Sequence, residues 1–306
     1  MRCPTLADLP SPPEGRTGWP WTEETPQLPD VMPDGKPWPK ISIVTPSFNQ
    51  GVFIEETIRS VLLQGYPNLE YCIMDGGSTD DTISIIKKYE NFLSWVSQED
   101  GGQADAIAKG FDRSSGTILA WINSDDRYLP DTFRKIAEAF NNHNANSVFV
   151  HGDVRVINEH SEYLYTIVAA RPNRFLTVNT ALGKWPQPGC FWRKDTYIKA
   201  GGVDKNFRFC MDLDLFIRLV NYGDTQYLQG GPLADFRLHQ DSKTSTLSDI
   251  ENREKQIIIQ KYGSPFFSKL YPLLLLGWIV WMGRRVFDVM EQKKAEYRLK
   301  RCKKDY

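Results

Sequence analysis

The chain has 306 residues, which is near the upper limit for one hydrophobic core, so we expect one large domain with appendages or two small domains. Apolar residues make up 41% and charged residues 25%, which argues against a wholly disordered, collagenous or polytopic membrane protein. The 37 basic and 38 acidic residues give a net charge of -1, so the total predicts no nucleic-acid partner.

The five cysteines are odd in number and stand singly, without a CxxC pair, so neither a disulfide framework nor a zinc ribbon fits. We expect all five to be buried or inert thiols. The first residues contain no apolar run of signal-peptide length, which favours a cytoplasmic protein. The cysteines are Cys3, Cys72, Cys190, Cys210 and Cys302.

Residues 1–39 form a leader that holds 10 of the 19 prolines and three tryptophans. Such a proline density excludes a helix or an internal strand and indicates an extended arm. Trp19, Trp21 and Trp38 are able to pin the arm to the body, and a poorly ordered leader is the alternative.

Strand and helix patterns alternate from residue 40 to residue 150. The β-branched run Ile41–Thr45 predicts a strand, and apolar spacing within residues 55–64 predicts a helix. Units of this kind build a parallel sheet covered by helices, and ligands bind beyond the carboxyl ends of its strands. Further strands are expected at 69–74, 92–96, 117–122 and 148–150, and further helices at 80–89, 104–111 and 130–140.

The alternation loosens after residue 150. We expect a meander with loops over 151–190, two helical stretches in 195–222, strands in 225–238 and a helix over 248–262. The domain boundaries that follow are an arm at 1–39, one α/β domain at 40–262 and a C-terminal segment at 263–306.

Polar clusters follow four of the predicted strands. They span residues 46–49, 75–80, 100–103 and 123–126. A helix cap or a tight turn explains any one of them, but carboxylates or amides at all four strand ends indicate one site at a single edge of the sheet.

Four stretches of sequence resemble the family 2 glycosyltransferases: ISIVTPSFNQGVFIEETIRSVLLQGYPNLEYCIMDGGSTDDT, EDGGQADAIAKGFDRSSGTILAWINSDD, MDLDLFIRL and RLHQDSKT. The resemblance covers roughly residues 40–262, and it is specific because four motifs occur in the right order. It implies the Rossmann-like GT-A fold, an α/β architecture with a mixed, mainly parallel sheet and flanking helices. It also implies an inverting reaction on a nucleotide-sugar donor.

The resemblance implies a nucleotide site at the strand ends. Asp75 would accept the imide hydrogen of a uracil-like base, which favours a UDP or dTDP sugar over a purine donor. The other residues assigned to this site are Pro46, Phe48, Asn49, Gln103, Asn123 and Ser124.

The metal motif of the family is usually Asp-x-Asp, and here it reads Asn123-Ser124-Asp125. Asp125 keeps the role of holding Mn²⁺ or Mg²⁺, while the missing first acid weakens the case for strict metal dependence. His239 stands where the family often supplies a second metal ligand or a diphosphate contact, although a lone histidine is more often structural.

The resemblance places the general base at Asp212, with a helix cap as the alternative role. Asp214 lies two residues further on, so on a helix it faces away and cannot share the task. Gln187, Trp192 and Asp126 are expected at the sugar and acceptor, although the aromatic residue could simply pack the loop. Lys243 and Thr244 are expected to close over the diphosphate.

Residues 270–282 form an apolar run of 13, about 20 Å long as a helix and short of the roughly 30 Å hydrocarbon core of a bilayer. From Arg284 onward nine basic and four acidic residues give +5. We expect an amphipathic helical segment on the inner face of the cell membrane, in contact with anionic lipid. The alternative is a core or homo-oligomer helix with a solvated basic tail.

The sequence thus predicts an inverting glycosyltransferase that moves a sugar from a nucleotide donor to a hydroxyl of a glycan or lipid-linked acceptor. The alternatives are a degenerate scaffold that only binds sugar nucleotides, suggested by Asn123, and a nucleotidyltransferase. The latter should carry a basic loop after the first strand, and residues 46–51 contain no Lys or Arg.

Overall fold

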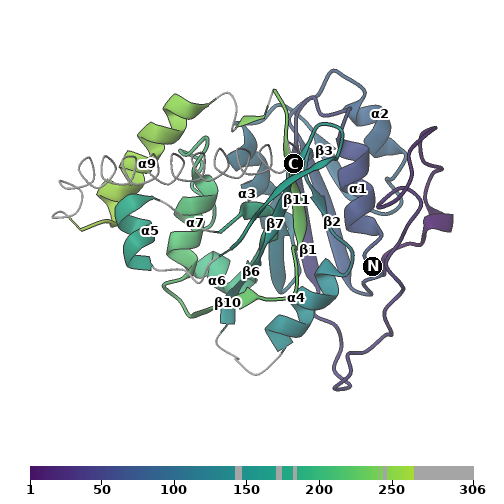
Figure 1. Cartoon of the computed structure of the whole chain (residues 1–306), viewed down its shortest axis with the longest axis horizontal. Coiled ribbons are helices and arrows are strands. Elements are labelled where there is room, and N and C mark those ends of the chain that lie inside the picture. Colours follow the sequence, from purple (N-terminus) through teal and green to yellow (C-terminus); the bar gives the residue numbers. More distant parts are fainter. Residues whose placement is uncertain (142–146, 170–173, 182–184, 241, 244–246, 265–306) are drawn as a thin grey trace, which may run out of the picture.

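The structure, a computed structural model, describes residues 1–141, 147–169, 174–181, 185–240, 242–243 and 247–264. In this part of the chain a seven-stranded sheet stands between two layers of helices (Figure 1). Strand β9 is antiparallel to both neighbours and the other pairings are parallel, as expected for a mixed, mainly parallel sheet. The spatial order is β10 (Asp224–Leu228), β6 (Ser147–Gly152), β9 (Cys190–Arg193), β4 (Ile118–Trp121), β1 (Ile41–Ser47), β2 (Leu69–Asp75) and β3 (Ser94–Ser97).

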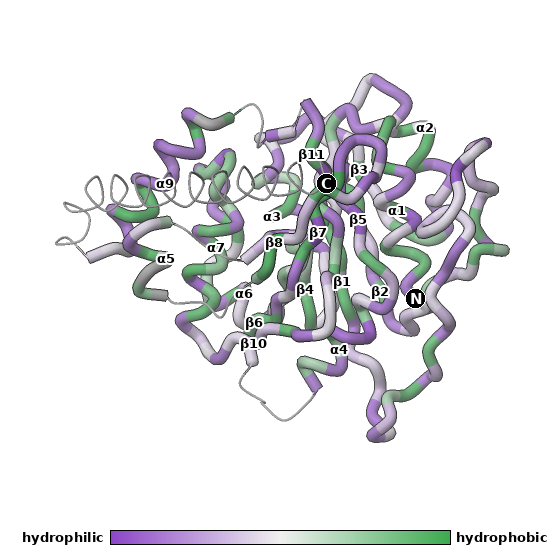
Figure 2. Tube along the Cα trace, viewed as in Figure 1, coloured by the Kyte–Doolittle hydropathy of each residue, from purple (hydrophilic) through white to green (hydrophobic). Residues whose placement is uncertain are grey.

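The central strands are apolar along their length because both faces of the sheet are covered. In β1 all seven residues are buried, with Ile41 and Ile43 in one hydrophobic core and Val44 in the other. Figure 2 shows the same apolar character along β1 and β4.

Each core lies under its own helices. One is covered by α1 (Ile54–Leu62), α2 (Thr82–Lys87) and α4 (Thr132–Asn141). The other is covered by α3 (Gln103–Arg113), α6 (Lys194–Lys199) and α7 (Met211–Leu219), extended by α5 (Arg174–Thr180) and α9 (Ser248–Tyr262).

Helix α3 lies unusually close to the sheet. A Cβ atom on Gly110 would be 2.5 Å from Val44 Cγ1, so only glycine permits this approach. The close packing fixes the start of α3, and therefore Gln103, next to the carboxyl ends of the strands.

A second, four-stranded sheet continues beyond the large one. Its order is β5 (Arg127–Tyr128), β11 (Ala234–Leu238), β7 (Val154–Asn158) and β8 (Tyr163–Ile167). The chain passes from β6 to β7 through Asp153, and β11 runs parallel to β7, so β11 delivers His239 to the edge where the large sheet ends. The sequence indicated a meander here and did not predict this sheet or α5.

The N-terminal arm lies against the body, at the opposite end of the molecule from α9 (Figure 1). The fully buried guanidinium of Arg59, in α1, donates hydrogen bonds to the carbonyls of Pro10, Pro20 and Trp21 at 2.9, 3.0 and 2.9 Å. Trp19 Nε1 donates to the carbonyl of Tyr128 at 2.8 Å. The arm is therefore held by hydrogen bonds as well as by its buried apolar side chains.

The alternation of strands and helices predicted for residues 40–150 is confirmed, with differences of a few residues at element ends. The four cysteines in the described residues are free and buried, and Cys302 lies outside them. The predicted C-terminal helical segment, including residues 270–282, also lies outside them. Within the described ranges, no helix has both the length and the apolar character needed to cross a bilayer.

Candidate active site

Four predicted site residues, from three distant parts of the chain, form one hydrogen-bond network. Gln103, at the start of α3, donates from Nε2 to Asn123 Oδ1 at 2.6 Å. Asn123, just after β4, donates from Nδ2 to Asp126 Oδ2 at 3.1 Å and to Gln187 Oε1 at 3.4 Å. The strand ends and the turn at Gln187–Gly189 therefore meet at one edge of the sheet, as the strand-end argument predicts.

Lys243 extends this network across the site. Its Nζ contacts Gln103 Oε1 and donates to the carbonyl of Arg208 at 3.1 Å. Arg208 belongs to the loop just before α7. One side chain thus joins the nucleotide side of the site to the segment that carries Asp212, while Thr244 lies outside the described residues.

Asp125 and His239 form a pair suited to a divalent metal. Asp125 Oδ2 and His239 Nε2 lie 3.1 Å apart, with 20% and 6% of the side chains exposed. Two neighbouring ligands of an octahedral ion at roughly 2.1 Å are about 3 Å apart, so the donor set and its spacing fit Mn²⁺ or Mg²⁺. The described residues contain no group of three or more His, Cys, Asp or Glu able to hold a metal ion.

Asp126 is a support for this pair rather than a contact of sugar or acceptor. It is 1% exposed, and its Oδ1 accepts a hydrogen bond from the Arg237 amide at 2.9 Å. Burial, reinforced by the charge of Asp125, raises the pKa of Asp126 well above its usual range. The expectation that Asp126 touches the substrate is therefore wrong, because its carboxylate is enclosed and bonded.

Arg237 and Glu56 belong to the site and were missed in the sequence. Arg237 Nε donates to the carbonyl of Asp125 at 2.8 Å, and Arg237 Nη2 donates to Glu56 Oε2, also at 2.8 Å. A signal existed in β11, where Asp235 and Arg237 alternate and so share one face of a strand. Two charges on one face of a buried strand indicate an ion network.

The carboxylate of Asp75 is 2% exposed and accepts four hydrogen bonds, from Gly77 N, Ser78 N, Ser78 Oγ and Ser97 Oγ at 2.5 to 3.0 Å. A carboxylate has about four acceptor sites, so an imide hydrogen must replace one present donor. The hydroxyls of Ser78 and Ser97 can rotate away, whereas the amides cannot. Contact of Asp75 with a base stays a prediction.

The loop after β1 presents an aromatic ring to solvent. Phe48 is 60% exposed, and Asn49 next to it has a φ of 53° and accepts from the Thr79 amide at 2.9 Å. Asn49 thereby ties the end of β1 to the end of β2. Pro46 and Ser124 are buried and form the floor of this region.

Asp212, the second residue of α7, is partly buried and accepts a hydrogen bond from the Leu213 amide at 2.7 Å. Burial raises the pKa of its carboxyl to about 6, and the charges of Glu251 and Glu254 act in the same direction. The N-cap position of the helix is Cys210, so Asp212 does not occupy the capping position that was its alternative role.

Asp214 has a structural environment, as its spacing from Asp212 predicts. It is fully buried and accepts from Arg218 Nε at 2.9 Å, Lys261 Nζ at 3.1 Å and Tyr262 Oη at 2.7 Å. These contacts join α7 to α9.

Trp192 is not available to a sugar, which corrects the sequence prediction. It lies in β9 with no exposed surface, and its ring packs at 5.4 to 5.8 Å from the rings of Trp121, Phe111 and Phe216. The motif that contains Trp192 folds into the sheet, so only its first half, with Gln187, reaches the site.

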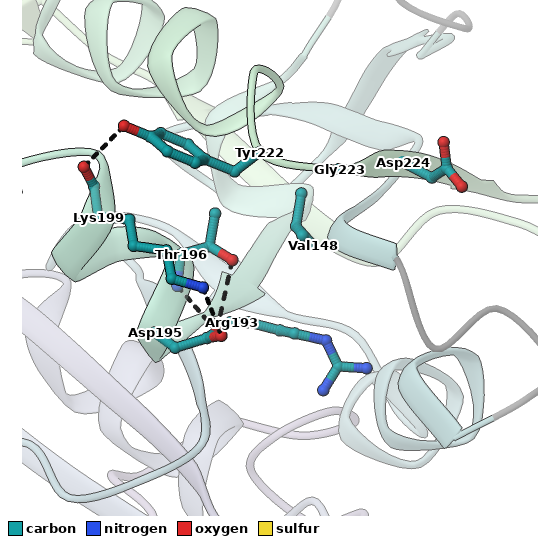
Figure 3. A pocket seen from close by; sticks show the side chains of 8 residues that line it. All are labelled: Val148, Arg193, Asp195, Thr196, Lys199, Tyr222, Gly223 and Asp224. Atoms are coloured by element: carbon teal, nitrogen blue, oxygen red, sulfur yellow. Dashed lines mark hydrogen bonds and ion pairs between the residues drawn. The ribbon is translucent and has the colours of Figure 1, made fainter.

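Two hollows occur in the described part of the chain. One, of about 530 Å³, is lined by Asn158, Glu159, Leu238, His239 and Gln240 and opens beside the Asp125–His239 pair. The other, of about 390 Å³, lies at the opposite edge of the sheet, where β6 and β10 begin (Figure 3). Its polar groups bond mainly to protein, for example Tyr222 Oη to the Lys199 carbonyl and Arg193 Nε to the Ser147 carbonyl, both at 2.8 Å.

A mixed, mainly parallel sheet between two layers of helices, with polar side chains gathered at its strand ends, is the architecture of a GT-A glycosyltransferase. A family model described as "Glycosyl transferase family 2" matches residues 42–193. TuaG, a Bacillus subtilis glycosyltransferase assigned to teichuronic acid biosynthesis, is 30% identical over 212 residues, covering 68% of this chain and 82% of TuaG. The chain belongs to glycosyl transferase family 2, and it is a glycosyltransferase.

Other relatives agree. An uncharacterized glycosyltransferase of Rickettsia prowazekii is 25% identical over 225 residues, which cover 71% of this chain and 70% of that protein. Among solved structures, S. aureus TarS 1–349 in complex with UDP-GlcNAc superposes with a TM-score of 0.55 at 16% identity, covering 73% of this chain and 71% of TarS 1–349. The likeness to TarS is one of fold, and it confirms the GT-A architecture predicted from the sequence.

Proposed function

We propose that this enzyme transfers a sugar from a UDP-sugar, with inversion, to a hydroxyl of a glycan or lipid-linked acceptor. The observation that carries the proposal is the continuous network from Asn123 through Gln103 and Lys243 to the loop before Asp212. It links the strand ends proposed to bind the nucleotide to the segment that carries Asp212. TarS binds UDP-GlcNAc on this fold, which supports a uridine donor.

In this proposal Asp212 takes the proton of the acceptor hydroxyl as the new bond forms. A carboxyl with a pKa of about 6 is ionised at neutral pH and is a stronger base than an ordinary aspartate. Inversion requires a single displacement, so one base on the acceptor side suffices.

Asp125 and His239 would hold a divalent cation, and Lys243 would contact the diphosphate as it departs. The cation supplies charge neutralisation for the leaving group. Arg237 holds the Asp125 carbonyl and the Asp126 carboxylate, so the metal pair is oriented before the donor binds.

The test is release of UDP from a panel of UDP, dTDP and GDP sugars, with Mn²⁺, Mg²⁺ or EDTA, for the wild type and Asp212→Asn. We expect a uridine donor to be used, and Asp212→Asn to lose about 10³-fold in kcat while binding UDP normally. Unchanged turnover by Asp212→Asn would remove Asp212 as the base, and a purine donor would overturn the assignment of Asp75.

We also propose that residues 265–306 hold the enzyme on the inner face of the cell membrane. Support comes from the apolar run at 270–282 and the +5 tail. A chain that ends at Ser264 retains α9 and the hydrogen bond from the Ser264 amide to Asn179 Oδ1 at 2.8 Å, so we expect it to keep the described fold. It should no longer sediment with vesicles containing about one third phosphatidylserine, and continued sedimentation would exclude this anchor.

A further inference from the structure

The backbone that leads into α7 is held by a carboxylate from another helix. Glu254, in α9, accepts hydrogen bonds from three successive amides: Arg208 N at 2.6 Å, Phe209 N at 2.9 Å and Cys210 N at 2.7 Å. The side chain is only 7% exposed. Both of its oxygens are therefore committed to the backbone that immediately precedes Asp212.

Glu254 holds the backbone that leads into α7 and not the helix itself. The helix begins at Met211, and the unpaired amides of its first turn start there. Asp212 Oδ1 itself accepts from one of them, Leu213 N, at 2.7 Å. The position of Asp212 therefore depends on the backbone that Glu254 fixes.

From this geometry we propose that Glu254 is a positioning residue for catalysis, which fixes the backbone before α7 and thereby the place of Asp212, the proposed base. The inference rests on the proposed function, because it assumes that Asp212 takes the acceptor proton. The sequence gives no sign of this role, because Glu254 stands among charged residues of a polar helix, 42 residues beyond Asp212.

Besides its hydrogen bonds to the backbone, Glu254 acts on Asp212 through its charge. Burial is the main cause of the raised pKa of Asp212, and Glu251 and Glu254 add to it. Lys243 interacts electrostatically with Asp212. The titratable groups around Asp212 are Glu251 and Glu254 of α9, the thiols of Cys190 and Cys210, and Lys243.

Glu254→Gln tests the proposal, with Glu251→Gln as the matched control. Glutamine keeps one acceptor oxygen, loses the charge and turns an NH₂ group toward at least one amide. Glu251 shares the electrostatic effect, and its carboxylate pairs with Lys255 and not with the amides that precede α7. The measurements are the kcat and KM for UDP release from the sugar nucleotide that the wild type hydrolyses, their pH dependence, and UDP affinity in Mn²⁺.

We expect Glu254→Gln to lower kcat tenfold or more, to leave UDP affinity within twofold, and to move the acidic limb of kcat to lower pH. Glu251→Gln should move the limb in the same direction and keep the plateau of kcat. A Glu254→Gln plateau within twofold of the wild type would overturn the proposal. A loss of kcat accompanied by an equal loss of UDP affinity, with the limb unmoved, would also overturn it, because a general structural role predicts that result.

Failure of the proposed function can be told apart from failure of the role proposed for Glu254. If Asp212→Asn stays active, the base has been assigned to the wrong residue, whatever Glu254→Gln does. If Asp212→Asn is inactive and Glu254→Gln behaves as the wild type, the base stands and only the role of Glu254 falls.

Discussion

The two sides of the candidate site are built in different ways. The nucleotide side, proposed to bind the donor, is a set of strand ends joined mainly by uncharged amides, as in the chain Gln103–Asn123–Gln187. The base side, which carries the proposed base Asp212, is a pair of helices, α7 and α9, with carboxylates that accept from backbone amides and cations. The first kind of site follows from the topology of the sheet, and the second depends on contacts between distant segments.

The largest effect should come from the metal pair between the two sides. Asp125→Ala should lower kcat/KM by about 10³-fold, because the departing diphosphate loses its cation. Mn²⁺ binding to the enzyme in the presence of UDP, followed by calorimetry, should weaken in parallel. Asp131→Ala, a surface carboxylate paired with Arg134, is the control and should behave as the wild type. Retained Mn²⁺ binding by Asp125→Ala would place the metal elsewhere.

The second effect separates two carboxylates that lie two residues apart on one helix. Asp214→Asn should destabilise the fold by about 3 kcal/mol, because Arg218 and Lys261 lose their buried partner. Asp212→Asn should leave stability unchanged or slightly raised at pH 7.5, since its charged form is disfavoured by burial. Urea unfolding of both variants checks this, and equal destabilisation would contradict the division of roles.

The third effect is the pH dependence that the base confers. Below pH 6, kcat/KM should fall about tenfold per pH unit, because Asp212 acts only when ionised. The raised pKa of Asp212 affects the stability of the fold in the opposite direction. The folded protein retains this proton where the unfolded chain loses it, so the contribution of Asp212 to stability decreases as pH rises from about 4 to 6. A profile that is flat between pH 5 and pH 7 would exclude Asp212 as the titrating group.

The smallest effect concerns the departure from the Asp-x-Asp pattern. Asn123→Asp removes the donor to Asp126 and Gln187 and adds a third acid to the loop, which should cost about 1–2 kcal/mol of stability. Mn²⁺ with UDP should recover part of that loss, because a cation relieves the repulsion. Melting temperatures with and without both ligands measure this, and a variant more stable than the wild type without metal would refute the explanation.

The sequence predicted that polar residues at the strand ends would meet, because each parallel strand delivers its last residues to the same edge. Asn123 and Gln103 were found in this way and Gln187 through resemblance, and the structure brings all three together. Their contact with a nucleotide or a sugar stays a prediction. Trp192 was misplaced because a motif read as one loop divides into a turn and a buried strand. Arg237 was overlooked although its alternation with Asp235 was visible.

The base side could not be derived in the same way. Asp212 was found through resemblance, and its separation from Asp214 follows from helical geometry. The contact with Glu254 depends on how α9 returns to the sheet, which no local pattern encodes. The second sheet was missed for a related reason, because its strands pair β5 and β11, which are more than 100 residues apart.

The N-terminal arm lies outside the part of the chain that the family pattern matches, yet it bonds residues inside that part. The family pattern starts at residue 42, yet the carbonyls that satisfy the buried guanidinium of Arg59 come from residues 10 to 21. The arm also bonds the carbonyl of Tyr128, three residues from Asp125. A protein trimmed to the family boundary would lose the carbonyls that accept from the Arg59 guanidinium, so we expect the segment matched by the family to be less stable than the whole chain.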